Sequence, residues 1–471
     1  MSSPSQILTP FGNPMKKHFL IDPNYRNLNH GSFGTYPTHL LTTQRTLQTT
    51  LESRPDIFIR YTQPTLLDSS RAALATYLNI SVNDCVLVRN ATTGVNTILH
   101  NLALTKTLTE KDAIIYFETV YGGVERALLA IKEGWGVQLR KVKFTFPISK
   151  EELVRRFRDA VEDAKRNGFN PRLAVFETIV SNPGIRFPFE ALIKVCKELG
   201  VLSLIDGAHG VGQVKLDLGK GGNLDGVDFW TSNCHKWLYT PRSCAVLYVP
   251  TRHHHLIRTS LPTSWGYNPP SPSAAGGEGK DELLPSVLPD GGKPPFVTLF
   301  EFTGTADDSA YTCVPAALRF RQEICGGEEA IYEYLEELAG VAGDAVAAAL
   351  GTDILTPVSG GGRLGCGMVN VRLPVRIGSG EGRGGKKGEE GVYVVQAKEV
   401  SALAHWFHEQ LGKRGTFVPC FLHGEWFYTR LSAQVYLEKS DFEWLGGVFK
   451  EILGGVEGFL GDLNLKVPAR L

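Results

Sequence analysis

Short apolar runs alternate with helical patterns between about residue 65 and residue 250 of this 471-residue chain. Apolar residues at helical spacing predict helices over 66–78, 94–102, 124–134, 150–166 and 189–199. The predicted strands between them are 85–90, 113–118, 137–144, 172–179, 202–206, 228–233 and 245–249. Because these strands are mostly continuous apolar runs, helices must cover both faces of their sheet. The sequence therefore predicts an α/β fold with a mostly parallel sheet sandwiched by helices.

The remainder of the chain predicts a second, smaller domain. Domains usually run to about 100–200 residues, so the length alone suggests two or three. Beyond residue 315, helical patterns surround a short strand region at 366–373, which indicates an α+β domain. The predicted parts are an N-terminal arm (1–20), a large domain (21–315) and a small C-terminal domain (316–471). Two Gly-rich segments, 268–295 and 376–391, are predicted to be surface insertions.

Charge and cysteine usage restrict the class of partner and the compartment. Basic and acidic residues balance at 49 each, so no overall field would recruit nucleic acid or an anionic membrane. No run reaches the roughly 18 apolar residues of a membrane span, and the N-terminus does not resemble a signal peptide. The eight cysteines are scattered, which favours a reducing compartment over a disulfide framework. We therefore expect a soluble cytoplasmic protein.

Polar side chains follow the predicted strands at the points where the strands end. The loops are NATT (90–93), YGG (121–123), SNPG (181–184), DGAH (206–209) and SNCHK (232–236). In sheets of this kind, ligands bind beyond the carboxyl ends of the strands. Such a set of loops predicts a ligand site at that edge of the sheet.

Lys236 is the residue on which the chemistry of this predicted site depends. A lysine in a cleft can lose its proton and form an imine with an aldehyde, although an isolated lysine is usually a surface residue. Asp206 ends a predicted strand, where a carboxylate can pair with a protonated pyridine nitrogen or cap the next helix. His209 is close enough in sequence to contact the same ligand. These residues favour pyridoxal phosphate as the cofactor.

The segment NATTGVN (90–96) predicts an anion site at a helix N-terminus. Backbone N–H groups and the hydroxyls of Thr92 and Thr93 could hold a phosphate, although such residues also serve as ordinary helix caps. Ser232 and His235 could donate to the same phosphate.

Tyr121 and Arg430 are candidates for contact with the cofactor ring and the substrate. Tyr121 could stack on a flat cofactor or donate a proton, and its alternative role is to cover the core. Arg430 lies in the strand-like run FYTRLSAQVY (427–436), where its guanidinium could hold a carboxylate. The alternative for Arg430 is a surface position on a half-buried strand.

Two further patterns predict no chemistry. The side chains of His253, His254 and His255 are adjacent in sequence and diverge, so no metal site is expected. Cys420 has apolar neighbours, which would keep its thiol protonated and unreactive.

Taken together, these segments resemble the fold-type I, class V aminotransferase-like family over nearly the whole chain. The matching segments are NHGSFGTYP (29–37), NATTGVN (90–96), SNPGIRFP (181–188), DGAHGVGQ (206–213), NCHKWL (233–238), FTGTADDSA (302–310) and TRLSAQVY (429–436). The resemblance implies a fold-type I transferase fold, pyridoxal 5'-phosphate as the cofactor, and a homodimer with the active site at its interface.

The resemblance also implies roles for individual residues. Lys236 would hold the cofactor covalently and move the α-proton of the substrate, Asp206 would pair with the ring nitrogen, and Arg430 would bind the α-carboxylate. The expected phosphate contacts are Thr92, Thr93, Ser232, His235 and, from a second subunit, the Gly304-Thr305 loop. The residues expected near the ring are Asn182, His209 and Tyr121, and those expected near the substrate are Asn29, His30 and Tyr61.

Other segments are most similar to the carbon–sulfur lyases of this family that cleave hercynylcysteine sulfoxide in fungal ergothioneine biosynthesis. They include RPDIFIRY (54–61), LPTSWG (261–266) and RLSAQVYLEKSDFEW (430–444). This similarity implies release of pyruvate, ammonia and a sulfur species, with Tyr121 as the proton donor to the leaving group. The aromatic candidates for the trimethylammonium group of that substrate are Tyr61, Trp265, Tyr267 and Trp426.

The same cofactor residues leave other functions open. A cysteine desulfurase, an amino acid racemase or epimerase, and an aminotransferase would all share Lys236, Asp206 and Arg430. A catalytically inactive scaffold on the same fold is the alternative that is not an enzyme. Fold and cofactor do not separate these functions, because the substrate pocket decides among them.

Overall fold

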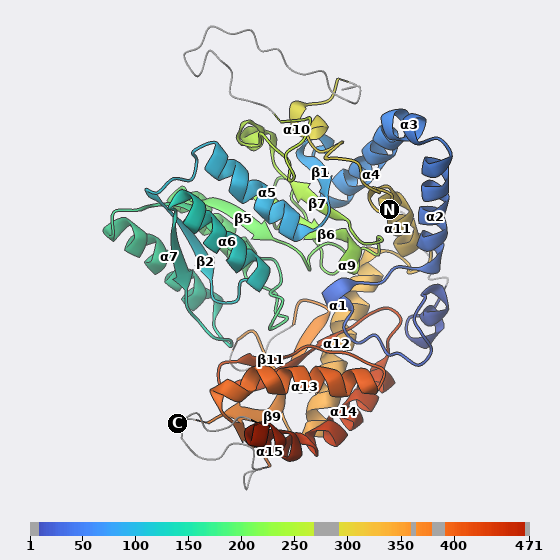
Figure 1. The fold of residues 1–471 in the computed structure, drawn as a ribbon, viewed down its shortest axis with the longest axis vertical. Coiled ribbons are helices and arrows are strands. Elements are labelled where there is room, and N and C mark those ends of the chain that lie inside the picture. The colour runs from blue at the N-terminus through green and yellow to red at the C-terminus, as the bar shows by residue number, and fades with distance from the viewer. Residues whose placement is uncertain (1–8, 268–291, 359–363, 379–390, 467–471) are drawn as a thin grey trace.

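The computed structural model describes residues 9–267, 292–358, 364–378 and 391–466. Within these ranges the chain forms two sheets with their own helices, and Figure 1 shows one above the other. None of the helices in the described parts of the chain has the length and apolar character that a membrane span requires.

The upper sheet in Figure 1, which we call the large sheet, has the strand order β1-β7-β6-β5-β4-β2-β3. Its strands are β1 (Cys85–Val88), β2 (Asp112–Phe117), β3 (Gln138–Val142), β4 (Asn170–Glu177), β5 (Leu202–Asp206), β6 (Phe229–Asn233) and β7 (Ala245–Tyr248). Strands β6, β5, β4, β2 and β3 run parallel to one another, whereas β7 is antiparallel to β1 and β6. The predicted mostly parallel α/β sheet is therefore confirmed.

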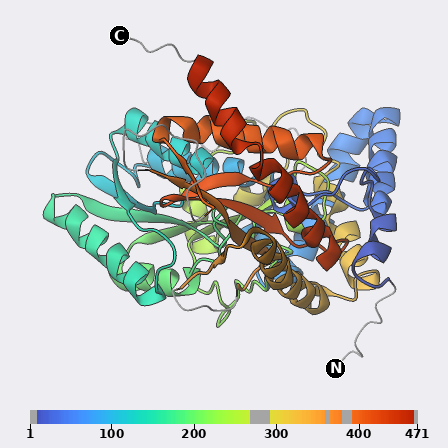
Figure 2. The same ribbon diagram turned by 90° about the horizontal axis from the view of Figure 1, so that it is seen from below.

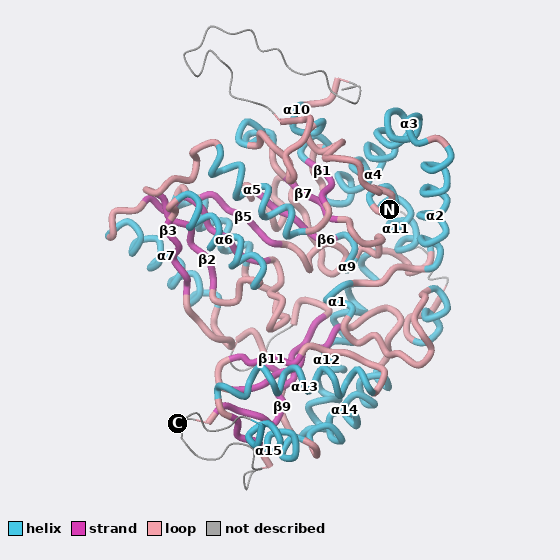
Figure 3. Tube along the Cα trace, viewed as in Figure 1, coloured by secondary structure: helices cyan, strands magenta, loops and turns pink. Residues whose placement is uncertain are grey.

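Helices cover both faces of the large sheet, as Figure 3 shows. On one face, Ile114 of β2 shares a core with α5 (Ala91–Leu104) and α6 (Gly122–Trp135). On the other face, Ile115 shares a core with α7 (Lys150–Arg166) and α8 (Phe189–Leu199). Successive strand residues point to opposite faces, so a continuous apolar run fills both cores. Helices α7 and α8 begin and end at the residues that apolar spacing predicts.

The second sheet lies in the C-terminal part of the chain and has the strand order β10-β9-β12-β11, with β8 also paired to β9. Its strands are β8 (Ile354–Leu355), β9 (Met368–Ile377), β10 (Tyr393–Val395), β11 (Cys420–His423) and β12 (Trp426–Ser432). Its helices are α11 (Val314–Glu323), α12 (Glu328–Leu350), α13 (Val400–Lys413), α14 (Lys439–Leu453) and α15 (Val456–Lys466). Figure 2 shows the red C-terminal helices in front of these strands.

Residues 368–373 of the predicted strand region 366–373 lie in β9, which extends to Ile377. The first residues of the predicted insertion 376–391 therefore belong to a strand, because they pair with β10 and β12. Residues 379–390 of that segment, and residues 268–291 of the predicted insertion 268–295, lie outside the described residues. The short helix α10 (Pro295–Thr298) begins at the last residue of the predicted insertion 268–295.

The N-terminal segment packs against the second sheet and then crosses to the large one. The backbone N–H of Gly12 donates to the Val435 carbonyl (2.8 Å), and that of Ser432 donates to the Leu28 carbonyl (3.1 Å). Helix α1 (His30–Phe33) follows and contacts α9 (Cys234–Trp237) of the large sheet. The helices that continue from it are α2 (Thr38–Ser53), α3 (Pro55–Ile57), the π-helix η2 (Phe58–Thr62) and α4 (Gln63–Leu78). Helix α1 therefore lies where the two sheets meet.

Candidate active site

A cavity of about 490 Å³ lies at the carboxyl ends of β4, β5 and β6, on the side that faces the second sheet. It is lined by Ser32, Phe33, Asn90, Ala91, Thr92, Tyr121, Glu177, Ile179, Ser181, Asn182, Asp206, Ala208, His209, Asn233, Lys236, Phe417, Pro419 and Arg430. Both sheets and the segment around α1 contribute to this lining. Polar residues from several strand-end loops therefore meet at this edge of the large sheet, and half of the predicted site residues line the cavity: Lys236, Tyr121, Asp206, His209, Thr92, Asn182 and Arg430.

Lys236 is in the short helix α9, which begins directly after β6. Burial first, and then the positive charge of Arg430, lower the pKa of its amine to about 7, although Asp206 acts in the opposite direction. The Lys236 Nζ lies 3.2 Å from Nε2 of His209. An amine with this pKa is neutral often enough near pH 7 to attack a carbonyl carbon or to accept a proton.

Asp206 is the last residue of β5 and is almost completely buried. Its Oδ1 accepts the backbone N–H of Ala208 (2.9 Å). Burial raises the pKa of this carboxyl, whereas the Ala208 N–H and the charge of Lys236 lower it. His209, on the same loop, is buried, and the indole N–H of Trp237 donates to its Nδ1 (3.5 Å). The proton of the neutral imidazole then sits on Nε2, the atom that faces Lys236.

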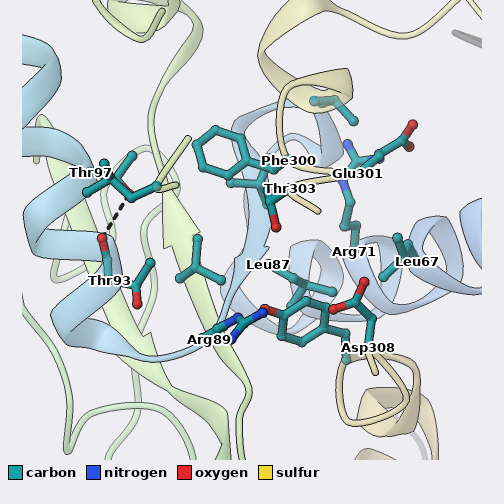
Figure 4. Close-up of a pocket in the computed structure, with 15 residues that line it drawn as sticks. Leu67, Arg71, Leu87, Arg89, Thr93, Thr97, Phe300, Glu301, Thr303 and Asp308 are labelled. Carbon is teal, nitrogen blue, oxygen red and sulfur yellow. Dashed lines mark hydrogen bonds between the residues drawn. The ribbon is translucent and has the colours of Figure 1, made fainter. Parts of the chain in front are cut away.

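The N-terminus of α5 contributes Thr92 to the cavity but turns Thr93 away from it. Asn90 caps the helix by accepting the Thr93 backbone N–H (2.8 Å) and the Thr93 hydroxyl (3.1 Å). Thr93 lines a separate pocket of about 20 Å³ together with Thr97 and Arg89, which Figure 4 shows. Thr92 therefore lines the cavity, whereas Thr93 lies in the neighbouring pocket.

Ser232 does not line the cavity, whereas its neighbour Asn233 does. The Ser232 hydroxyl donates to the Gly207 carbonyl and accepts the Val211 N–H (3.0 Å), so it holds the loop after β5. Successive residues of β6 point to opposite faces, which sends Asn233 into the cavity instead. Its Oδ1 accepts the backbone N–H of Ala91 (2.8 Å) at the start of α5.

His235 is also directed away from the cavity lining. Its Nδ1 lies 2.8 Å from the Cys244 carbonyl, and burial lowers the pKa of its imidazole to about 4. This histidine therefore joins the loop before β7 to α9.

Tyr121 precedes α6, and its side chain is half exposed in the cavity wall. Its backbone N–H donates to Oε1 of Glu177 (3.1 Å). Glu177, the last residue of β4, is buried beside Asp206, and sequence reasoning did not single it out. The signal was an acidic residue at the end of the apolar strand RLAVFETI. Asn182 lies in the loop that follows β4, and its exposed side chain lines the cavity.

Arg430 comes from β12 of the second sheet and is almost completely buried. Its Nη1 donates to the Ser181 carbonyl (2.7 Å), and its Nη2 donates to Oδ1 of Asn29 (2.8 Å) and to Oγ of Ser32 (2.9 Å). Burial lowers the pKa of its guanidinium to about 10. Among the described residues this guanidinium forms no ion pair, so its charge is available to an anion in the cavity.

Some predicted substrate residues lie outside the cavity lining. His30 is fully buried, and both of its ring nitrogens have partners. Its Nε2 donates to the Lys236 carbonyl (2.6 Å), and its Nδ1 accepts the Tyr436 hydroxyl (2.9 Å). Burial lowers the pKa of its imidazole to about 3. Asn29 reaches the site only through Arg430. The exposed residues Tyr61 and Thr305 do not line the cavity of this subunit.

The other aromatic candidates are also elsewhere. Trp265 is exposed, Tyr267 stacks with Arg258 (5.6 Å), and Trp426 stacks with Arg372 (4.5 Å). The aromatic rings that do line the cavity are Phe33, Tyr121 and Phe417, and Phe33 is 71% exposed. Phe33 lies in the segment NHGSFGTYP (29–37) that matches the family, but nothing in its spacing predicts that its ring reaches this cavity.

No cysteine lines the cavity. All eight thiols lie in described parts of the chain and are buried. Burial raises the pKa of the Cys420 thiol to about 12, so this thiol is protonated and unreactive at neutral pH.

The polar groups of the cavity fit pyridoxal phosphate. Lys236 supplies an amine for its aldehyde, Asp206 a buried carboxyl for its ring nitrogen, and Thr92 a hydroxyl at a helix N-terminus for its phosphate.

Comparison with known proteins agrees with this arrangement. A sequence model of the family described as Aminotransferase class-V matches residues 62–264. The chain is 39% identical to the L-cysteine desulfhydrase-like protein lolT1 of Epichloe uncinata, over 94% of this chain and 96% of the relative. It is 30% identical to the hercynylcysteine sulfoxide lyase of Schizosaccharomyces pombe, over 94% of this chain and 97% of the relative.

The fold is also similar to that of the cystine C-S lyase C-DES in complex with cysteine persulfide. The TM-score is 0.67 at 17% identity, over 92% of this chain and 98% of that chain. A C-DES variant with the same TM-score carries glycine covalently linked to its PLP cofactor.

Proposed function

This chain belongs to the aminotransferase class V family of pyridoxal phosphate enzymes, and we propose that it is a carbon–sulfur lyase that acts on a cysteine conjugate. The substrate that we propose is hercynylcysteine sulfoxide, which would yield pyruvate, ammonia and the sulfur species of ergothioneine biosynthesis. The observation that carries the proposal is one cavity that holds Lys236 and Arg430, has an aromatic wall and contains no thiol.

Arg430 would bind the α-carboxylate of the substrate. Its guanidinium is held by one carbonyl, one amide oxygen and one hydroxyl, so its positive charge is positioned but not neutralised. A buried charge without a counter-ion favours a ligand that supplies one. An amino acid carboxylate has the charge and the planar shape for this contact.

Lys236 would bind the cofactor and afterwards move the α-proton. Bound pyridoxal phosphate supplies an electron sink that stabilises negative charge at the α-carbon. A pKa of about 7 lets the Lys236 amine accept a proton near neutral pH, as a general base requires. His209, 3.2 Å away, would orient that amine, and Asp206 would hold the proton of the ring nitrogen.

Tyr121 would donate a proton to the departing sulfur group. Its phenol is in the cavity wall, and its backbone is fixed by the hydrogen bond to Glu177. The bond that breaks joins the β-carbon to sulfur, and its electron pair leaves with the sulfur. The net reaction consumes one water and forms pyruvate, ammonia and a sulfenic acid.

The absence of a thiol from the cavity lining favours a lyase over a desulfurase. A desulfurase that passes sulfur to a cysteine of its own needs a reactive thiol, which requires exposure and a lowered pKa. The eight thiols of this chain are all buried. Sulfur would therefore leave with the product.

The aromatic wall of the cavity, rather than its volume, which must also hold the cofactor, supports a substrate larger than cysteine. Its volume of about 490 Å³ falls within the range of sites for small organic ligands, which is about 300–1,000 Å³. Phe33 and Phe417 line it together with Tyr121. Aromatic faces attract quaternary ammonium groups, so Phe33 and Phe417 are our candidates for the trimethylammonium group.

L-Cysteine desulfhydrase activity is a second candidate. It is favoured by the 39% identity to lolT1, which is named L-cysteine desulfhydrase-like. The same residues would act on cysteine, and the sulfur product would be sulfide.

A second copy of the chain would complete the cofactor site. Thr305 is exposed and lies outside the cavity lining of its own subunit. We expect the Gly304-Thr305 loop to contact the cofactor phosphate in the partner subunit of a homodimer. Analytical ultracentrifugation would test the dimer.

Product identification separates these functions. The enzyme should be given hercynylcysteine sulfoxide, L-cysteine and a pair of D and L amino acids in separate assays. We expect pyruvate from the sulfoxide with a kcat/KM at least about tenfold above that for L-cysteine, which corresponds to about 1.4 kcal/mol of transition-state binding. Preference for L-cysteine would support the desulfhydrase, and inversion without pyruvate would support an epimerase.

A further inference from the structure

Glu177 is a second carboxyl in the cavity wall, and the roles above use only its contact with the Tyr121 backbone. It ends β4 and stands opposite Asp206, which ends β5, in the parallel register of the two strands. Register partners in neighbouring strands point to the same face of a sheet. The two side chains therefore lie side by side, with exposed fractions of 2% and 4%.

The two oxygens of Glu177 have different surroundings. Oε1 accepts the Tyr121 backbone N–H (3.1 Å). Oε2 is buried and has no hydrogen-bond partner within the described part of the chain. No cation of the described ranges forms an ion pair with this carboxyl. A buried carboxylate in these conditions is costly, and the neutral acid is favoured.

Several titratable groups face Glu177 across the cavity. They are Asp206 from β5, His209 from the following loop, Lys236 from α9, Arg430 from β12 and Tyr121 from the loop before α6. Of these, Asp206 has the largest effect. Burial first, and then the negative charge of Asp206, raise the pKa of Glu177 to about 8, while the Tyr121 N–H acts in the opposite direction.

Asp206 is the better anion of the pair. It receives the Ala208 N–H, and the charge of Lys236 lowers its pKa against the effect of burial. Two neighbouring buried carboxyls cannot both ionise readily, so one of them keeps a proton. The contacts assign that proton to Glu177.

We propose that Glu177 is a proton-holding carboxyl of the cofactor site, neutral at neutral pH, which on ionising places a second negative charge beside Asp206. This inference rests on the proposed role of Asp206 in the cofactor site. Only an O–H bond breaks, and the proton passes to solvent. A nearby negative charge favours a protonated ring nitrogen, so ionised Glu177 would strengthen the pairing of Asp206 with the cofactor in alkaline solution. In both states Glu177 is also a positioning residue for Tyr121.

The test compares Glu177→Gln with the wild-type holoenzyme in the absence of substrate. Glutamine keeps an oxygen for the Tyr121 N–H but cannot ionise. The visible absorption of the bound cofactor is followed from about pH 6 to about pH 10, which brackets this group. We expect a transition near pH 8 in the wild type that is missing from Glu177→Gln, with cofactor affinity unchanged within about threefold.

Glu125→Gln is the matched control. Glu125 lies in α6 outside the cavity lining, where it pairs with Lys141 (2.7 Å). This variant should retain the wild-type transition. Identical titrations of Glu177→Gln and the wild type would overturn the inference while leaving the proposed lyase intact. A wild type with no visible band after addition of cofactor would contradict the proposed function itself.

An infrared measurement keeps the test decisive if Glu177→Gln binds cofactor poorly. The difference spectrum of the wild-type apoenzyme between neutral and alkaline pH should contain the carbonyl stretch of one protonated carboxyl. That band should be lost in Glu177→Gln apoenzyme, and its persistence there would overturn the inference.

Discussion

The two sheets contribute different kinds of side chain to the same cavity. The large sheet supplies Lys236, Asp206 and Glu177 from the carboxyl ends of its strands. Burial lowers the pKa of the Lys236 amine and raises the pKa of the two carboxyls, so it favours the neutral form of each group. The second sheet supplies Arg430, whose guanidinium is held by neutral oxygen atoms. Lys236 and Glu177 can therefore exchange protons near neutral pH, whereas Arg430 stays charged.

This difference separates chemistry from recognition. Covalent attachment and proton transfer require groups whose charge can change, and those groups are on the large sheet. Binding of a carboxylate requires a fixed charge, and that charge comes from β12 with support from the segment around α1. Substitutions in the two sheets should consequently have effects of different kinds.

Lys236→Ala should have the largest effect. It removes both the amine that binds the cofactor and the base that moves the α-proton, so lyase activity should fall by more than about 10⁴-fold. The visible band of the bound cofactor should also be lost. Absorbance and pyruvate release measure the two effects, and a variant that keeps both would contradict the assignment.

Tyr121→Phe should lower the lyase rate by about 10²–10⁴-fold, the usual contribution of a general acid. Its ring and backbone contacts remain, so the cofactor spectrum should stay unchanged. Single-turnover pyruvate release measures the rate of the chemical step. A rate equal to that of the wild type would remove Tyr121 from this role.

Arg430→Ala should weaken substrate binding by about 10–100-fold, because hydrogen bonds to a charged group contribute about 1.5–3 kcal/mol. The cofactor spectrum should be preserved, in contrast to Lys236→Ala. Arg430→Lys serves as the companion variant, since it keeps the charge and loses the fork of donors. Loss of cofactor in both variants would show that the second sheet also serves the chemistry.

The pH dependence of cofactor attachment should report the ionisation of Lys236. Only the neutral amine attacks an aldehyde, and burial lowers the pKa of this amine to about 7. Attachment to apoenzyme should thus slow by about tenfold for each pH unit below 7 and level off above it. Stopped-flow absorbance measures the rate, and a continued rise to about pH 10 would indicate an ordinary exposed lysine.

Trp426→Leu should have the smallest effect. Trp426 stacks with Arg372 and does not line the cavity, so kcat/KM should change by less than about twofold. Phe417→Leu provides the contrast, because Phe417 lines the cavity. It should raise KM for the trimethylammonium substrate more than KM for L-cysteine, and equal changes for the two would remove Phe417 from that role.

The large sheet could be predicted from sequence because its strands are buried on both faces and its helices carry a clear apolar period. The same apolar pattern shows where each strand ends, and the polar residues beyond those ends predicted the ligand site. Of these residues, Lys236, Asp206 and Tyr121 all line the cavity. Asn233 rather than Ser232 lines the cavity because the phase of β6 decides which side chain enters it, and a run of polar residues does not reveal that phase.

Residues that reach the cavity from other parts of the chain were harder to predict. Phe417 and Phe33 approach it only because the second sheet and α1 pack against the large one. His30 was expected near the substrate, but both of its nitrogens are used to join α9 to the C-terminal region. Such contacts depend on long-range packing, which apolar spacing along the chain does not encode.

Chemical trapping of the cofactor tests the role of Lys236 most directly. Holoenzyme reduced with borohydride and digested with protease should yield a single modified peptide, with the pyridoxyl group on the lysine of HKWL (235–238). A pyridoxyl group on another lysine, or none on Lys236, would contradict the assignment of this cavity as the cofactor site.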